Sequence, residues 1–332
     1  MRVLQVSSAR TLGGGETHVS ELTAKLRDLG HEIVVAGKRA GPLHPEIALP
    51  FLNSVDIVSA LRLRSILRQK PFDIVHAHVA RDYTVVLAAA WGVPDVKVVL
   101  TRHLLYPVKR HALYRRVDGW LAPTSQILRT LGPLEPKHSD VIPNWVNVRK
   151  FAFLPHSQHS PVTVGLLGQI SPHKGHDDAI EAIRELGAGY RLLIAGKGES
   201  NYVESLKRKA AGLPVEFPGF VELPDFFAMI DILAVPSWEE PFGIVLLEAM
   251  ASGIPLVSTA CGGPLDIVES EEHGLLVPPK SPLALAQAIH RLGVNPGLRD
   301  HVVRQARQRV EEHYDIDAVV PRIVDFYQSL NA

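Results

Sequence analysis

The chain has a single cysteine, Cys261, so it cannot form an intramolecular disulfide. A disulfide-stabilised secreted domain is therefore excluded, and the reducing cytosol is the expected location. The sequence also lacks an apolar run long enough to span a bilayer. It starts almost at once with an expected strand, Val3–Ser7, which leaves no room for a signal peptide before it. We expect a cytoplasmic protein that is soluble or peripheral at the inner face of a membrane.

The chain as a whole has no excess of charge, with 35 basic and 35 acidic residues, but its halves differ. Residues 1–150 contain 21 Lys and Arg against 12 Asp and Glu, whereas the remainder contains 14 against 23. This asymmetry fits an acceptor-binding or membrane-facing surface on the first half, and it fits unequal solvated surfaces equally well. Nothing in the pattern points to a nucleic-acid partner.

The basic residues of the first half form two clusters with apolar neighbours. The spacing of Arg64 and Arg68, and of Leu61 and Leu67, predicts a helix with one basic and one apolar side. Leu104–Tyr106 are the apolar neighbours of the second cluster. An anionic lipid-linked acceptor or a membrane surface would be attracted to such a face, while a solvated basic face with a neutral acceptor is the alternative. The clustered residues are Arg62, Arg64, Arg68, Lys70, Lys109, Arg110, Arg115 and Arg116.

Apolar strand patterns alternate with helical ones along the chain, which is typical of parallel sheets covered by helices on both faces. The alternation occurs twice, so we expect two doubly wound, Rossmann-like domains over 1–153 and 154–312, with a linker where the periodicity breaks. C-terminal helices over 313–332 are expected to return toward the first domain, with a break or kink at Pro321. The expected strands are Val3–Val6, Glu32–Ala36, Ile74–His76, Val96–Leu100, Trp120–Ala122, Thr163–Leu167, Arg191–Ala195, Val215–Phe217, Ile232–Val235, Leu256–Ser258 and Leu275–Val277.

Two carboxylates, Glu240 and Glu248, lie eight residues apart around the expected start of a helix at Ile244. The first free backbone N–H groups of that helix, near Phe242 and Gly243, form an anion site that suits a diphosphate. Glu248 has apolar neighbours and so needs polar partners such as sugar hydroxyls. Alternatively, both carboxylates are ordinary solvated side chains.

Ligands of doubly wound domains bind at the carboxyl ends of the strands, so the loops there carry the information. The first strand ends in a glycine-rich loop whose amides, at Gly14 and Gly15, can face a phosphate, although a plain glycine turn has the same composition. The first strand of the second half leads to Lys174, which can neutralise a diphosphate unless it is simply a solvated loop lysine.

The order of these motifs resembles that of the family 4 retaining glycosyltransferases of GT-B fold, glycosyl transferase group 1. The resemblance runs nearly end to end and includes Val141–Asn144, Gly262–Val268 and Gly274–Pro279. It implies two Rossmann-like domains that face each other across a cleft. It also implies retaining transfer of a hexose from a nucleoside diphosphate sugar to a sugar or lipid-linked acceptor, in cell-surface polysaccharide or glycolipid synthesis. No cofactor is expected apart from the donor.

The resemblance implies that His103, Lys174 and Glu240 are catalytic. Glu240 would bind donor-sugar hydroxyls, Glu248 the nucleotide ribose, and Lys174 with the glycine loop the diphosphate. Gln169 stands where the family usually has an arginine, so Lys197, Arg102, His173 or helix dipoles would have to supply the missing positive charge. The expected donor-binding residues are Gly14, Gly15, Gln169, Lys174, Glu240, Phe242, Gly243, Ile244 and Glu248.

Loss of the diphosphate through an oxocarbenium-like transition state makes stabilisation of the leaving group the main catalytic task. A lysine, backbone amides and a helix start can meet it, so no metal is expected. The pairs His76/His78 and His173/His176 offer too few ligands for zinc. Two other functions remain open. A GT-B sugar-nucleotide epimerase would need no acceptor, and a non-catalytic sugar-nucleotide-binding protein would tolerate Gln169.

Overall fold

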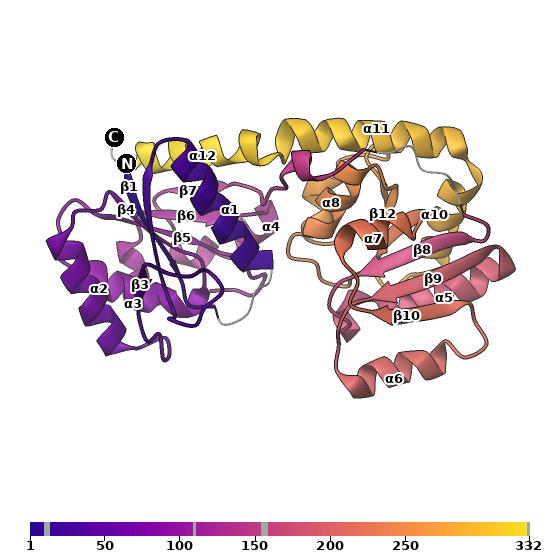
Figure 1. Cartoon of the computed structure of the whole chain (residues 1–332), viewed down its shortest axis with the longest axis horizontal. Helices are drawn as coiled ribbons and strands as arrows, with labels where there is room; N and C mark the ends of the chain where they lie inside the picture. The colour runs from indigo at the N-terminus through magenta and orange to yellow at the C-terminus, as the bar shows by residue number, and fades with distance from the viewer. Residues whose placement is uncertain (10–13, 109–110, 154–158, 331–332) are drawn as a thin grey trace. The chain divides into compact units, whose positions relative to one another are not determined.

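The structure is a computed structural model that describes residues 1–9, 14–108, 111–153 and 159–330. The chain divides into two compact α/β units, Met1–Trp145 with Ile316–Ala332, and Val146–Asp315. Each unit contains one parallel sheet with interleaved helices, which confirms the predicted fold class (Figure 1). Part of the first glycine-rich loop, residues 10–13, and the basic residues 109 and 110 lie outside the described residues.

The first unit has a seven-stranded sheet in the order β3-β2-β1-β4-β5-β6-β7. One core packs α2 and α3 against one face of this sheet, and another packs α1 and α12 against the opposite face. The strands are β1 (Arg2–Ser7), β2 (Glu32–Gly37), β3 (Ile47–Ala48), β4 (Ile74–Ala77), β5 (Lys97–Thr101), β6 (Gly119–Ala122) and β7 (Ser139–Val141), and the α-helices are α1 (Gly14–Asp28), α2 (Ile57–Gln69), α3 (Tyr83–Ala90), α4 (Ser125–Arg129) and α12 (Ile316–Ser329).

The second unit has a six-stranded sheet in the order β10-β9-β8-β11-β12-β13. Its two cores pack α5, α6 and α10 against one face and α7, α8 and α11 against the other. The strands are β8 (Val162–Leu167), β9 (Tyr190–Ala195), β10 (Val215–Gly219), β11 (Ile232–Val235), β12 (Leu256–Thr259) and β13 (Leu275–Val277). The α-helices are α5 (His176–Leu186), α6 (Ser200–Lys209), α7 (Leu223–Ala228), α8 (Ile244–Ser252), α9 (Pro264–Ile267), α10 (Pro282–Val294) and α11 (Pro296–His313).

Every strand expected from the sequence is present, and α8 has the predicted bounds. The sequence prediction missed β3 and β7, which lie at the two edges of the first sheet. Both are very short, and β7 is largely exposed, so neither has the buried apolar run that predicts a strand. None of the helices in the described part of the chain combines the length and apolarity needed to cross a bilayer.

The division between the units lies inside the predicted linker at residues 143–160, but it differs from the predicted domain boundaries. Val146 and Val148 pack in a core of the second unit, and Val146 forms a β-bridge with Asp315. The Asp315 carboxylate also accepts a hydrogen bond from the Val148 N–H at 3.1 Å. These contacts place the crossings at 145–146 and 315–316, rather than at the predicted 153–154 and 312–313.

The sequence predicts a break or a kink at Pro321, and the structure has no break there. The break separates α11 from α12 around Asp315, and Pro321 lies inside α12. Val319, Val320 and Ile323 on both sides of the proline are buried in a core of the first unit. Because most helical stability in proteins comes from such packing, the helix continues through the proline.

Candidate functional site

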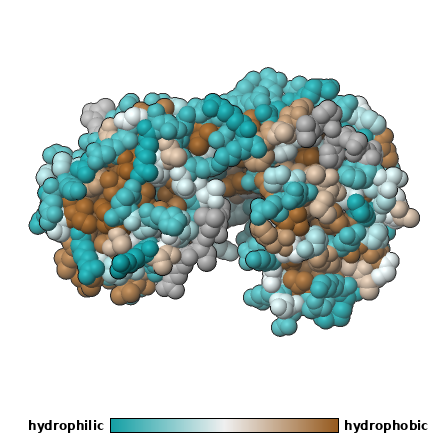
Figure 2. Space-filling view, viewed as in Figure 1, coloured by the Kyte–Doolittle hydropathy of each residue, from teal (hydrophilic) through white to brown (hydrophobic). Residues whose placement is uncertain are grey.

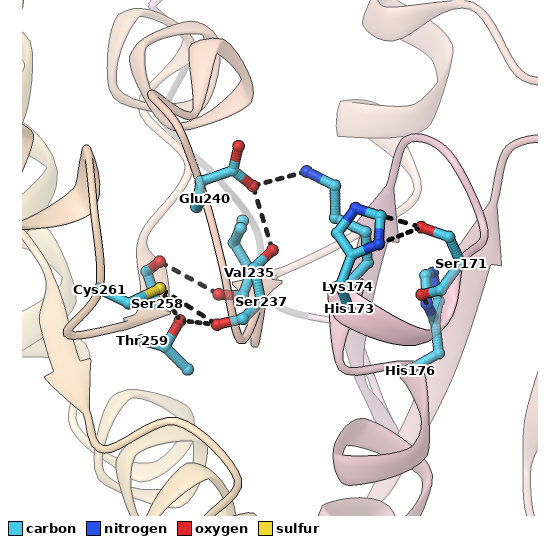
Figure 3. A network of polar contacts seen from close by, with 10 residues as sticks. All are labelled: Ser171, His173, Lys174, His176, Val235, Ser237, Glu240, Ser258, Thr259 and Cys261. Carbon is cyan, nitrogen blue, oxygen red and sulfur yellow. Dashed lines mark hydrogen bonds and ion pairs between the residues drawn. The ribbon is translucent and has the colours of Figure 1, made fainter. Parts of the chain in front are cut away.

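Three loops meet at the carboxyl edge of the second sheet, where β8, β11 and β12 are neighbours. The loop after β8 carries Lys174, and the loop after β11 carries Ser237 and Glu240 (Figure 3). The Lys174 Nζ lies 2.7 Å from Oε2 of Glu240, and the Ser237 hydroxyl donates to the same oxygen at 3.0 Å. Glu240 is only 6% exposed. A nearly buried carboxylate is therefore paired with a lysine that is itself partly exposed.

Gly175 allows the β8 loop to approach the end of β11. Its φ is +70°, and a Cβ at this position would lie 1.9 Å from the Pro236 carbonyl oxygen. The Trp238 N–H donates to the His173 carbonyl at 2.7 Å and joins the same two loops. Together these contacts fix Lys174 beside Glu240, so the Lys-Gly pair found in the sequence has a geometric reason.

Residues at the end of β12 and in the loop that follows it hydrogen-bond to the loop that carries Glu240. The Gly263 N–H donates to the Glu240 carbonyl at 2.9 Å, and a Cβ on Gly263 would lie 2.1 Å from the Phe242 carbonyl oxygen. The Thr259 hydroxyl and the Cys261 thiol both donate to the Ser237 carbonyl (Figure 3). Burial raises the pKa of Cys261, which keeps it a neutral thiol in a supporting position.

The helix α8 begins at the expected place. Gly243 is its N-cap with φ +97°, a conformation that favours glycine, and Ile244 is its first residue. Phe242 is buried in a core of the second unit, which anchors the turn. Glu248 lies in the second turn of α8 and is partly buried. The expected donor-binding residues 240 to 248 therefore share one strand-loop-helix segment.

Gln169 is exposed in the loop that follows β8. Its neighbour Ile170 donates its N–H to the Lys197 carbonyl at 2.8 Å and forms a bridge with Gly198. This backbone pairing brings the β9 loop, with the exposed side chain of Lys197, alongside Gln169. Of the cations expected to replace the arginine, Lys197 and His173 belong to this unit, whereas Arg102 belongs to the first.

His103 follows β5 in the first unit and belongs to a group of aromatic rings. Its ring centroid lies 5.7 Å from that of His18, and the His18 ring stacks on Trp145 at 3.7 Å. Burial, with Arg102 close by, lowers the pKa of His103 to about 4. The imidazole is therefore neutral at pH 7 and offers one hydrogen-bond donor and one acceptor.

The neighbouring His76 and His78 stack at 4.0 Å in the same unit. His76 is hydrogen-bonded at both ring nitrogens, to the hydroxyls of Tyr327 and Thr101, each at 2.6 Å. Burial, with His103 close by, lowers the pKa of His78 to about 3. His76 is thus a structural histidine. Among the described residues, no group of three or more His, Cys, Asp and Glu side chains has a geometry that could hold a metal ion.

The remaining predicted residues, Gly14 and Gly15, are the first two residues of α1 in the first unit. Like His103, they do not belong to the unit that holds Lys174 and Glu240. Sequence reasoning missed Ser237, which donates to Glu240, and the stacking of His18 on Trp145. Ser237 closely follows β11, and its position at the carboxyl end of a strand could have indicated a place in the site.

Two family models together match almost the whole chain, "Glycosyl transferases group 1" over residues 151–309 and "Glycosyltransferase Family 4" over 12–150. The D-inositol 3-phosphate glycosyltransferase of Acidothermus cellulolyticus is 30% identical over 82% of this chain and 71% of that protein. The chain is a family 4 glycosyltransferase with the GT-B fold. This assignment confirms the resemblance found in the sequence.

One further relative and one solved structure extend the comparison. An uncharacterised glycosyltransferase of Methanocaldococcus jannaschii is 30% identical over 62% of this glycosyltransferase, which spans 55% of that relative. The crystal structure of HepE from Anabaena in complex with UDP and glucose superimposes with a TM-score of 0.82 at 19% identity, covering 99% of this chain and all of that one. At this identity the superposition demonstrates the shared fold alone.

Proposed function

We propose that this glycosyltransferase transfers a hexose from a nucleoside diphosphate sugar to a hydroxyl of a sugar or lipid-linked acceptor. Transfer retains the anomeric configuration, needs no divalent metal and takes place in the cytoplasm, in the synthesis of cell-surface polysaccharide or glycolipid. The observation that carries the proposal is the pairing of Lys174 with the buried Glu240 beside the start of α8. The HepE complex, which contains UDP and glucose, supports the donor class by analogy of fold.

Glu240 suits a donor-sugar site because its two oxygens have different surroundings. Lys174 and Ser237 both contact Oε2, while Oε1 points away from these contacts (Figure 3). Oε1 would accept hydrogen bonds from sugar hydroxyls, and charge assistance makes such bonds stronger than neutral ones. The Oε2 contacts orient the carboxylate before the sugar binds.

The same lysine is placed to act on the leaving group. Cleavage of the anomeric C–O bond leaves its electron pair on the departing diphosphate, whose negative charge grows in the transition state. The Lys174 ammonium is anchored by one hydrogen bond to Glu240 and has further N–H donors for a phosphate oxygen. The free amides at the start of α8, near Gly243, add a second source of positive potential.

Retention requires the acceptor oxygen to reach the face that the diphosphate leaves. The acceptor proton would pass to the departing diphosphate as the new C–O bond forms, so no enzymatic nucleophile is invoked. The neutral His103 imidazole would hydrogen-bond a sugar hydroxyl without adding a competing positive charge. Glu248 would bind the nucleotide ribose through its carboxylate.

The test is a panel of UDP-, GDP- and ADP-sugars, with nucleotide release followed by mass spectrometry in the presence of pooled hydroxyl acceptors. Transfer predicts one preferred donor, acceptor-dependent release and a product whose anomeric coupling constant matches that of the donor. An epimer formed from donor alone would support the epimerase instead. Saturable donor binding with no release under any condition would support a non-catalytic binding protein.

A further inference from the structure

A stretch of the first unit exposes large apolar side chains next to one another. Val55 and Ile57 are 73% and 71% exposed, and Leu52, Leu61 and Val58 are 67%, 62% and 48% exposed. They lie in the loop before α2 and in its first two turns. Figure 2 shows hydrophobic side chains gathered over α2 of this unit. Exposed apolar side chains that cluster in this way mark a site that binds a protein, a membrane or a ligand.

The outward face of α2 differs from the sequence prediction. Leu67 lies in a core of the first unit together with Leu63, so it does not share an apolar side with the exposed Leu61. Helical spacing instead places Ile57, Leu61 and Arg68 on one side of the helix. The outward face of α2 is therefore apolar in its first two turns and basic at its end.

This surface is fixed before any partner arrives. The Asp56 carboxylate caps α2 by accepting from the Ser59 N–H at 3.1 Å and from the Leu52 N–H at 2.9 Å. The Thr84 hydroxyl donates to the Ser54 carbonyl and ties the loop to α3. No loop ordering is therefore required for the apolar side chains to project together.

An aromatic and a basic side chain extend the surface onto α3, which packs against α2. Trp91, at the C-terminal end of α3, is 52% exposed, and the Arg116 guanidinium lies 4.0 Å from its ring centroid. Tryptophan with an adjacent cation is typical of the boundary between hydrocarbon and water.

The exposed charges between positions 52 and 70 have one sign. Arg62, Arg68 and Lys70 are exposed, and Asp56 is the only acidic residue between positions 52 and 70. Asp56 is 5% exposed, and its carboxylate accepts the hydrogen bonds that cap α2. It therefore does not offset the positive charge of the exposed arginines. An occupant must therefore be apolar where it meets α2 and negatively charged around that contact.

We propose that this surface docks the glycosyltransferase onto an anionic lipid membrane. The side chains of Leu52, Val55, Ile57, Val58 and Leu61 enter the acyl boundary, and Arg62, Arg68, Lys70 and Arg116 contact phosphate headgroups. A second copy related by a two-fold axis would bring the same arginines against each other, so charge complementarity favours lipid.

Vesicle co-sedimentation tests the proposal without donor or acceptor, so its outcome is independent of the proposed transfer reaction. The vesicles are phosphatidylcholine alone and a mixture with phosphatidylglycerol, each at low and high salt. Binding should require phosphatidylglycerol and weaken with salt. Arg62→Gln and Arg68→Gln should each weaken binding about fivefold. The double variant Ile57→Ser/Leu61→Ser should weaken it at least about tenfold.

The matched controls lie in the second unit, where Leu283 is 57% exposed and Arg208 is exposed. Leu283→Ser and Arg208→Gln should bind as the wild type does, and circular dichroism should show that all variants fold. Absence of binding to the anionic vesicles at low salt would overturn the proposal. So would equal losses in the controls, or a stable dimer by light scattering that Ile57→Ser/Leu61→Ser separates without any effect on vesicles.

Discussion

Lys174 and Glu240 form an ion pair of 2.7 Å in which the carboxylate is nearly buried and the ammonium is partly exposed. The two residues come from different strand ends, and Gly175 allows them to meet. Because the lysine faces solvent on one side, it can contact a ligand without leaving the glutamate. The predictions for the proposed reaction follow from this asymmetry.

Lys174→Ala should reduce turnover more than donor affinity, since the partner charge of Lys174 is greatest in the transition state. We expect kcat to fall about a hundredfold or more, with a smaller change in KM. Lys207→Ala is the matched control, because Lys207 is exposed and pairs only with Glu204 among the contacts described. A change confined to KM would mean that Lys174 docks the nucleotide but does not stabilise the leaving group.

Metal removal should leave the reaction intact. Lys174 and the start of α8 supply positive potential without a metal that bridges phosphates, so EDTA should not change the steady-state rate of nucleotide release. A parallel assay with added Mg²⁺ or Mn²⁺ is the control. Inactivation by EDTA that either ion restores would contradict this part of the mechanism.

Gly175→Ala should destabilise the second unit by about 3 kcal/mol, since the new Cβ would overlap the Pro236 carbonyl at a positive φ. Gly212→Ala is the matched control, because Gly212 also has a positive φ, +78°, but has nothing within 4 Å of the new Cβ. This variant should cost only about 1 kcal/mol. Urea unfolding measures both changes, and equal losses would show that the close approach to Pro236 is unimportant.

Acidification should destabilise the first unit through its buried histidines. The folded-state pKa of His78 is about 3, below the ordinary value of 6.5, so unfolding takes up a proton between these values. The free energy of unfolding has its full value above about pH 6.5. Below that pH it falls by up to about 1.4 kcal/mol per pH unit for each such histidine. Urea unfolding at about pH 7.5 and pH 5 measures the effect. His78→Gln should reduce the slope, and a stability independent of pH over this range would contradict the prediction.

The sequence predicted the regular elements and the order of the site segments because they depend on local patterns. Buried apolar runs bounded by glycine and proline marked the strands, and Gly243 and Gly253 marked both ends of α8. Lys174 and Glu240 were expected only to contact different parts of one donor, the diphosphate and the sugar. Their direct ion pair depends on how two distant loops pack, which no local pattern records.

Other predictions were wrong, and other features were missed, because they also depend on how distant parts of the chain pack. The outward face of α2 was misassigned because spacing alone does not tell which side of a helix faces the core, and Leu67 proved to be buried. The stacking of His18 on Trp145 joins residues far apart in the chain. The crossing at 145–146 lies inside the predicted linker, and its position is set by the pairing of Val146 with Asp315, which are far apart in the chain.

The most direct test of the central claim is kcat/KM at limiting donor for Glu240→Gln against Glu239→Gln. Glu239 is the exposed neighbour, so its variant controls for the change in charge. Loss of a charge-assisted bond worth about 1.5–3 kcal/mol predicts that Glu240→Gln falls roughly 10- to 150-fold while Glu239→Gln is unchanged. A folded Glu240→Gln enzyme that turns over at the wild-type rate would contradict the assignment of this carboxylate to the donor sugar.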